Sequence, residues 1–287
     1  MTPEASIPVD WPSSLPKVHR RFLELALGIL PADLRVMGLA AGGSYLANAM
    51  DELSDLDLVI ATQACDHASV MAERRGIAGL LGRVLAAFTG EHVGEPRLLI
   101  CLYDGDPPLH VDLKFVALPD LATRVENPAV LWERDGQLSR ALREGACHYP
   151  RPDLQWIEDR VWVWVHYAAT KIGRGEIFEV LDFLSFFRTT VLGPLALDSV
   201  GARPAGVRKI EMLAPDHAQR LRATVGTYDA ADCARALHSC IDCYRQLRAG
   251  HTSFQLRDAA EAASLRYLAD IEAGLNRIAE GATCRYE

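Results

Sequence analysis

Residues 42–57, GGSYLANAMDELSDLD, carry the most informative pattern in the chain. The apolar run before them, residues 34–41, ends on two glycines, which is typical of a buried strand that enters a tight turn. Ser44 is a good helix N-cap residue, so the sequence predicts a short helix over residues 45–52. The alternation in SDLDLVIA, residues 54–61, then predicts a second strand.

Two carboxylates lie in this second predicted strand. Residues two apart in a strand point to the same side, so Asp55 and Asp57 place their carboxylates on one face. Two carboxylates this close repel each other strongly unless a cation lies between them. Magnesium prefers hard oxygen ligands and is usually held by one or two carboxylates together with substrate phosphates. The pair therefore indicates a magnesium site.

A third acid lies on a later predicted strand. Residues 109–117, LHVDLKFVA, alternate strictly, with Asp112 on the polar face between His110 and Lys114. If this strand lies beside the one that carries Asp55 and Asp57, the three acids converge. Three such acids can hold one or two metal ions, or two can hold metal while the third takes a proton.

The remaining pattern divides the chain into two domains. Residues 17–31 and 66–89 are helical in spacing, residues 96–104 and 129–136 predict strands, and residues 149–152 form a plausible linker. Beyond the linker only helices are predicted, over residues 153–174, 176–192, 207–224, 229–249 and 255–280. The sequence thus predicts an α+β domain over residues 1–150, of which 1–16 are a loose leader, and a helical domain over residues 151–287.

The composition narrows the class of function. Hydrophobic residues make up 49% and charged residues 24% of the 287 residues, as in a globular protein, and no uninterrupted apolar run reaches the roughly 18 residues of a membrane span. The N-terminus lacks the basic start and apolar core of a signal peptide, and seven scattered cysteines do not indicate a disulfide framework. We therefore expect a cytoplasmic protein without a membrane partner. The net charge of −8 argues against a nucleic-acid partner and favours cationic ligands.

The order of these motifs resembles that of the polymerase-beta-like nucleotidyltransferase superfamily. The resemblance rests on a hydrophobic run, a Gly-Gly-Ser turn, Asp-x-Asp about ten residues later and an acid on a later strand; the matching residues are Gly42, Gly43, Ser44, Asp55, Asp57 and Asp112. It covers roughly residues 33–190. A catalytic domain with a mixed sheet flanked by helices, followed by a helical bundle, is similar to the antibiotic nucleotidyltransferases, which adenylylate aminoglycosides and lincosamides.

The resemblance implies roles for these residues. Gly42, Gly43 and Ser44 would bind the triphosphate of ATP, while Asp55 and Asp57 would be magnesium ligands. Asp112 would be a third metal ligand or the general base, and both roles stay open. In the helical domain, the position that matches a phosphate-binding lysine of the family is Lys171, with Arg174 beside it.

The resemblance predicts a magnesium-dependent enzyme of antibiotic resistance. It would move AMP from ATP to a hydroxyl of a small molecule, release pyrophosphate and act as a monomer or homodimer. One alternative is a nucleotidyltransferase with a protein acceptor. The other is a non-catalytic nucleotide-binding module of the same fold.

Overall fold

The computed structural model describes residues 10–283, and their side chains as far as residue 277. The chain divides into two compact units, Met1–Tyr149 and Pro150–Glu287. Of the expected leader, residues 1–9 lie outside the described residues. In the described part, the backbone amide of Ser14 donates to Asn48 Oδ1 at 3.1 Å, so this part is tied to the loop after the Gly-Gly-Ser turn.

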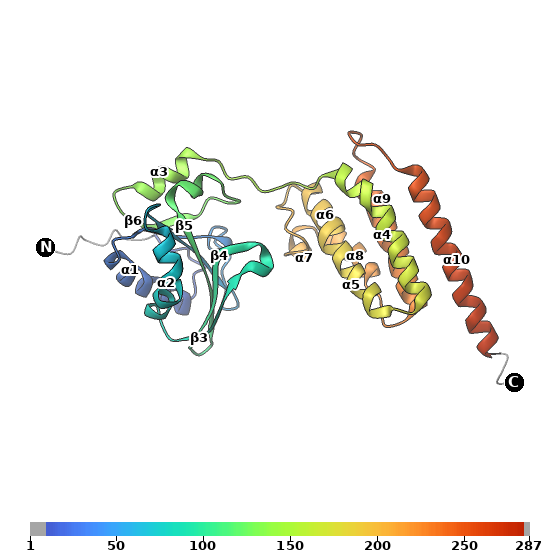
Figure 1. Ribbon diagram of the computed structural model, residues 1–287, viewed down its shortest axis with the longest axis horizontal. Helices are drawn as coiled ribbons and strands as arrows, with labels where there is room; N and C mark the ends of the chain where they lie inside the picture. The colour runs from blue at the N-terminus through green and yellow to red at the C-terminus, as the bar shows by residue number, and fades with distance from the viewer. Residues whose placement is uncertain (1–9, 284–287) are drawn as a thin grey trace. The chain divides into compact units, whose positions relative to one another are not determined.

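The first unit is built on one six-stranded mixed sheet (Figure 1). Its strands are β1 Val36–Ala41, β2 Leu56–Thr62, β3 Val84–Gly90, β4 Glu95–Tyr103, β5 Leu109–Ala117 and β6 Ala129–Glu133. They lie in the order β3-β4-β5-β2-β1-β6, and only β2 and β5 pair in parallel. The helices of this unit are α1 Lys17–Ile29, α2 His67–Leu80 and α3 Gln137–Glu144, with short 3₁₀ turns η1 Leu30–Ala32, η2 Gly43–Tyr45, η3 Glu91–Val93 and η4 Leu118–Ala122. The predicted α+β class is confirmed.

The two faces of the sheet are covered to different extents. The apolar residues of β2 and β5 that alternate with the acids, such as Leu58 and Leu113, are fully buried and pack with α1 and α2 in one core. On the opposite face, Ala61 and Val116 pack under Leu121 of η4 and residues of α3 in a smaller core. Because side chains alternate along a strand, the acids of β2 and β5 share this second face, where the smaller core ends.

The predicted helix over residues 45–52 is wrong. Only η2, Gly43–Tyr45, is helical, and Ser44 is not a cap, since η2 begins after Gly42 without a side-chain cap. Asn48 has a φ of +48°, a left-handed conformation that a continuing helix cannot contain. Its side chain oxygen accepts the amide of Ser14, so contacts with the N-terminal segment fix a loop where local propensity favours a helix.

The predicted helix over residues 66–89 is correct only as far as Leu80. Gly82 has a φ of +149°, which few other residues adopt, and the chain then enters β3. Strand β3 pairs antiparallel with β4, for example Phe88 with Ile100. Pairing with a neighbouring strand therefore outweighs the helical preference of the alanines in this segment.

The second unit contains only helices in the part that the structure describes. They are α4 Leu154–Arg174, α5 Ile177–Phe187, α6 Gly193–Ser199, α7 Ile210–Leu213, α8 Pro215–Leu221, α9 Ala230–Arg248 and α10 Asp258–Thr283, with the π-helical turn η5 Arg188–Leu192 and the 3₁₀ turn η6 Arg222–Thr224. The predicted helix over residues 207–224 is interrupted at Ala214, before Pro215, because proline lacks the amide that would continue the helix.

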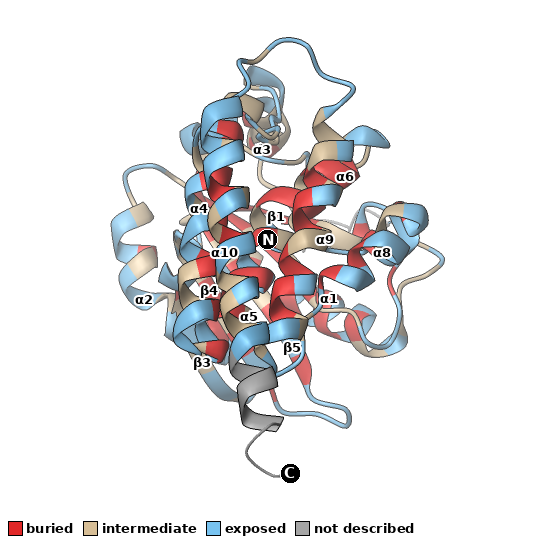
Figure 2. Cartoon of the chain, turned by 90° about the vertical axis from the view of Figure 1, so that its right-hand side faces the viewer, coloured by how far each residue is buried: buried red, intermediate tan, exposed pale blue. Residues whose placement is uncertain are grey.

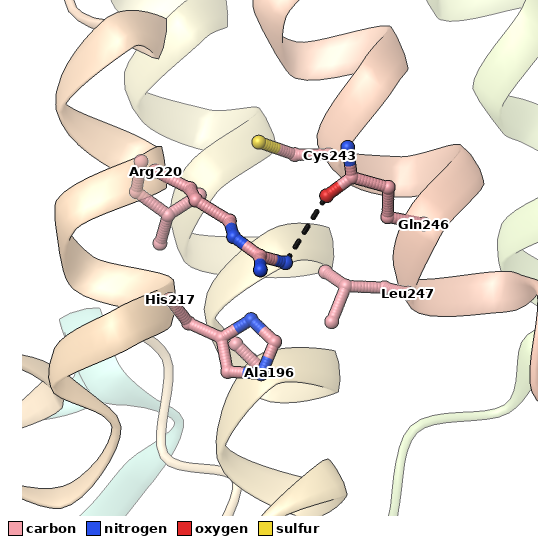
Figure 3. A pocket seen from close by; sticks show the side chains of 7 residues that line it. Ala196, His217, Arg220, Cys243, Gln246 and Leu247 are labelled. Atoms are coloured by element: carbon pink, nitrogen blue, oxygen red, sulfur yellow. Dashed lines mark hydrogen bonds between the residues drawn. The ribbon is translucent and has the colours of Figure 1, made fainter.

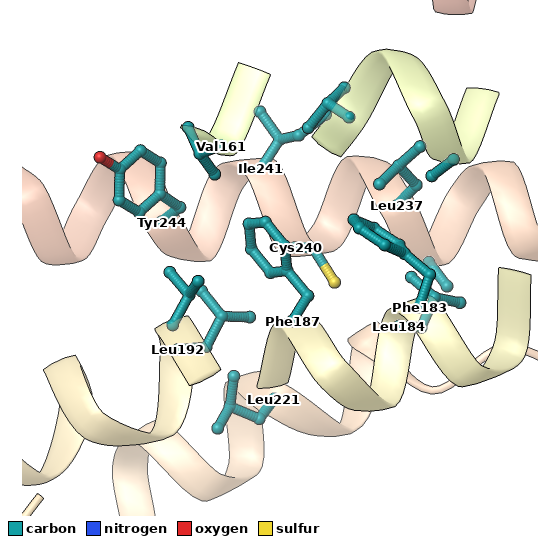
Figure 4. Close-up of a cluster of buried hydrophobic side chains, with 14 of the residues drawn as sticks. Val161, Phe183, Leu184, Phe187, Leu192, Leu221, Leu237, Cys240, Ile241 and Tyr244 are labelled. Carbon is teal, nitrogen blue, oxygen red and sulfur yellow. The ribbon is translucent and has the colours of Figure 1, made fainter. Parts of the chain in front are cut away.

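One apolar core joins these helices. Phe187 of α5, Leu192, and Leu237 and Cys240 of α9 are fully buried and lie together in Figure 4. In Figure 2, α4 alternates between buried and exposed stretches, as expected for a helix with one packed face. The continuous helical segment Ile177–Ser199 is long and apolar enough to cross a membrane by composition, yet 56% of its most apolar window is buried within the protein. Its place in this core accounts for its composition.

A buried carboxylate links α4, α9 and the residue that precedes α10 in the second unit. The side chain of Glu158 on α4 is 0% exposed and forms an ion pair with Arg248 on α9 at 2.8 Å. It also accepts hydrogen bonds from Tyr244 Oη at 2.5 Å, Trp162 Nε1 at 2.9 Å and the amide of Arg257 at 2.9 Å. Burial acts to raise the pKa of Glu158, but these hydrogen bonds outweigh it, so the pKa is lowered.

Candidate active site

The structure places two of the three predicted acids side by side. Strands β2 and β5 run parallel in a register that pairs Asp57 with Asp112. Neighbouring strands lie about 4.8 Å apart, and register partners in a parallel pair project from the same face. Both side chains are partly buried, and that of Asp112 is 19% exposed. Asp55 lies one residue before β2 begins and is also partly buried.

The Gly42-Gly43 turn is packed against Asp57. The amide of Gly42 donates to the backbone oxygen of Asp57 at 2.8 Å, which ties the turn to the start of β2. Gly43 has a φ of +57°, and a Cβ atom there would lie 1.9 Å from Asp57 Oδ2. Glycine is therefore required at position 43 for two reasons, the left-handed backbone and the space that the carboxylate fills. Ser44 follows within η2 and is partly exposed.

A second carboxylate, which the sequence reasoning missed, lies at the same turn. Glu126 comes from the loop between η4 and β6, and its Oε1 accepts the amide hydrogen of Gly43 at 3.0 Å. A Cβ atom at Gly42 would lie 2.6 Å from the same oxygen. Each of the two glycines thus leaves room for one carboxylate. No local pattern around Glu126 signals this contact, because it joins residues 83 positions apart.

The face beside the acids is polar and carries both charges. His110 Nε2 lies 3.0 Å from Asp112 Oδ1, so the imidazole orients this carboxylate. The next residue on this side of β5, Lys114, forms an ion pair with Glu95 at 2.7 Å. Hydrogen bonds from Arg97 and Lys114 outweigh burial and lower the pKa of Glu95 to about 2. The acids therefore lie at the edge of a network of ion pairs.

A pocket adjoins the acids on this face. It has a volume of about 90 Å³, and its lining residues include Val59 of β2, Lys114 of β5, and Arg124 and Glu126 of the loop before β6. Val59 and Lys114 are register partners, and each lies two residues further along its strand than Asp57 or Asp112. A step of two residues in a strand is about 6.6 Å, so the pocket lies within reach of a molecule bound at the acids.

The donor set fits a magnesium ion at the pair. Two carboxylates at adjacent register positions are oxygen ligands of the kind that magnesium takes, and a cation between them would relieve their repulsion. Among the side chains that the structure describes, no three or more of His, Cys, Asp and Glu form a group that could hold a metal ion. Asp57 and Asp112 would therefore hold the ion as a pair, with further ligands from water and substrate. Asp55 as a third ligand stays a prediction.

The predicted phosphate-binding residues of the second unit are held by acids. Lys171, in the last turn of α4, lies 2.5 Å from Glu176 and 3.2 Å from Glu179, and these contacts raise its pKa. Arg174 lies 3.7 Å from Glu176 and is mostly exposed. Tyr167 donates to Glu179 in a short hydrogen bond and also lies under the ammonium group of Lys171. Within this unit, the lysine charge is thus compensated by two carboxylates.

A separate pocket lies wholly in the second unit (Figure 3). It has a volume of about 50 Å³ and is lined by Ala196, His217, Arg220, Leu221, Cys243, Gln246 and Leu247. Arg220 donates to Gln246 Oε1 across it at 3.2 Å. None of the predicted site residues lines this pocket, so the candidate site is the face that carries Asp57 and Asp112.

The solved structures that are similar to this chain include the following two. An aminoglycoside 6-adenyltransferase from Bacillus subtilis is 13% identical, with 88% of this chain and 97% of that chain covered and a TM-score of 0.38. A nucleotidyltransferase-like protein from Exiguobacterium sibiricum 255-15 is 12% identical, with 84% of this chain and 77% of that chain covered and a TM-score of 0.36. No protein-family model and no curated protein matches the chain.

Proposed function

We propose that this protein is a magnesium-dependent nucleotidyltransferase that moves AMP from ATP to a hydroxyl group of a small molecule. The observation that carries the proposal is the pairing of Asp57 with Asp112 on parallel neighbouring strands, next to a glycine turn that closes on Asp57. Nucleotidyl transfer needs a cation site and a polyphosphate site within a few ångströms of each other, because catalysis depends mainly on positioning and on compensation of phosphate charge.

The roles follow from the chemistry of the side chains. Asp57 and Asp112 would hold a magnesium ion, which when bound would neutralise charge on the phosphoryl oxygens. The Gly43 amide is a donor at a turn with a positive φ, a geometry that suits anions such as phosphate. The acceptor oxygen would attack the α-phosphorus, and the bond from that phosphorus to the bridging oxygen would break. Pyrophosphate would leave, and Asp112 would accept the proton of the hydroxyl group if it serves as the base.

The acceptor that we propose is an amine-bearing small molecule, with aminoglycosides and lincosamides as the classes to test first. The net charge of −8 favours a cationic acceptor over nucleic acid. The order of an α+β domain followed by a helical domain, which resembles that of antibiotic nucleotidyltransferases, supports the same choice. We propose Lys171 as a phosphate ligand, which would require its ammonium group to exchange Glu176 and Glu179 for a triphosphate.

Pyrophosphate release tests this function. The full chain is incubated with magnesium, ATP and single members of a panel of aminoglycosides and lincosamides, and Asp57→Ala serves as the control. We expect release that depends on one acceptor class and falls at least about 100-fold in the variant, since a metal ligand is lost. Equal release by the variant would refute the assignment of Asp57. Binding of magnesium–ATP without release on any acceptor would instead favour a non-catalytic module or a protein acceptor.

A further inference from the structure

Glu126 occupies the donor that the proposed function assigns to phosphate. Its Oε1 lies 3.0 Å from the amide nitrogen of Gly43, and the missing Cβ of Gly42 provides the space for that oxygen. A carboxylate and a phosphate oxygen are both anionic acceptors, and a single amide hydrogen cannot serve both well. The two anions would also repel each other at this distance.

From this competition, we infer that Glu126 is a displaceable occupant of the polyphosphate site, and that its carboxylate sets how tightly the turn binds polyphosphate. This inference rests on the proposed function. Each triphosphate that binds at the turn would first release Glu126 from the Gly43 amide. The intrinsic affinity of the turn for phosphate would therefore be higher than the affinity measured for the whole protein.

The displaced side chain has a position to enter. Glu126 lines the pocket of about 90 Å³ on the sheet face, whose lining also includes Arg97 and Lys114. Lys114 is in contact with Glu95 at 2.7 Å, and Arg97 lies 2.7 Å from Glu95 and 4.0 Å from Asp120. A carboxylate that rotates into this pocket would meet Arg97 and Lys114, whose charges it would share with Glu95 and Asp120, and these cations would offset part of the cost of the hydrogen bond that it leaves.

The backbone that carries Glu126 is held in place by its neighbour. Arg124 donates to the backbone oxygens of Leu121 at 2.9 Å, Leu142 at 2.6 Å and Gly145 at 3.0 Å. These bonds tie the loop to η4 and to the end of α3. The release of Glu126 from the Gly43 amide would therefore be a rotation of its side chain, while the backbone of the loop stays in place.

Tripolyphosphate binding tests the inference without any acceptor or metal. Calorimetry on the full chain at fixed ionic strength compares the wild type with Glu126→Gln, which keeps the shape and removes the charge. In this variant the Gly43 amide no longer donates to a charged carboxylate in competition with tripolyphosphate. The Kd for tripolyphosphate is therefore expected to fall roughly tenfold. Glu144→Gln is the matched control, since it removes one charge from an exposed acid at the end of α3 that does not line this pocket. It is expected to change the Kd by less than about twofold.

A second variant distinguishes loss of the Glu126–Gly43 hydrogen bond from a folding defect in Glu126→Gln. Glu126→Asp keeps the charge but shortens the side chain by one methylene, so it should also release the Gly43 amide and tighten binding. An equal or weaker affinity of both Glu126 variants, or no detectable binding by any of the proteins, would overturn the inference. The outcome is separate from that of the transfer assay, since a chain that transfers nothing would still show the change in tripolyphosphate affinity.

Discussion

A single added methyl group at Gly43 should abolish activity while the fold survives. In Gly43→Ala the Cβ atom would lie 1.9 Å from Asp57 Oδ2, whereas ordinary contacts begin at 3.4 Å, so the carboxylate must retreat by about 1.5 Å. Displacements of about 1 Å in a catalytic group can cost roughly 100-fold in rate. The positive φ of +57° adds about 1 kcal/mol of backbone strain for alanine. We therefore expect at least about a 100-fold loss of kcat, with a loss of stability of only about 1–2 kcal/mol.

The strain and the displacement can be measured separately. Gly136 has a φ of +68°, and a Cβ atom there would meet nothing within 4 Å, so Gly136→Ala carries the strain without the collision. Both variants are compared by urea unfolding and by pyrophosphate release under saturating ATP. Similar losses of stability, with loss of activity in Gly43→Ala only, are the expected result. Unchanged kcat in Gly43→Ala would refute the role of the Gly43–Asp57 packing.

Three further predictions concern the second unit. Arg248→Met should reduce the free energy of unfolding by about 3 kcal/mol in urea titration, because it leaves the fully buried carboxylate of Glu158 without its ion-pair partner; a loss under about 1 kcal/mol would contradict this. Because the pKa of Glu158 is lowered in the folded state, its charge stabilises the fold above the ordinary pKa of 4.5, and this stabilisation is lost as the pH falls through the folded-state pKa. Glu158→Gln should therefore reduce the slope of the free energy of unfolding against pH in the acid range. An unchanged slope would contradict a buried, ionised Glu158. Lys171→Met should raise the KM for ATP about tenfold in steady-state assays if the lysine binds phosphate, and an unchanged KM would remove it from the site.

The strands that carry the acids could be predicted from local pattern. Residues 109–117 form β5 with the predicted bounds, because strict alternation reports one buried and one exposed face. The register that pairs Asp57 with Asp112 could not be predicted, since it depends on which strands become neighbours in the sheet. Strand β3 was missed for the same reason, because its alanines favour a helix until β4 is present.

Loop contacts were equally beyond the sequence pattern. The contact of Glu126 with Gly43 spans 83 positions, and no periodicity reports a contact between two loops. The glycines themselves were informative, because two in succession indicate a turn that needs space or a positive φ. The pattern could not say that the space at Gly43 is filled by Asp57.

Binding of a divalent cation tests the central claim most directly. Manganese, as a paramagnetic substitute for magnesium, is titrated into the full chain with a non-hydrolysable ATP analogue and followed by electron paramagnetic resonance. The wild type, Asp57→Asn and Asp112→Asn are compared with Glu144→Gln, which removes one charge from an exposed acid at the end of α3. If Asp57 and Asp112 hold the ion as a pair, the affinity for manganese should be at least about tenfold weaker in both Asp variants and unchanged in the Glu144→Gln control. Equal affinity in all four proteins would contradict the assignment of the metal site to Asp57 and Asp112.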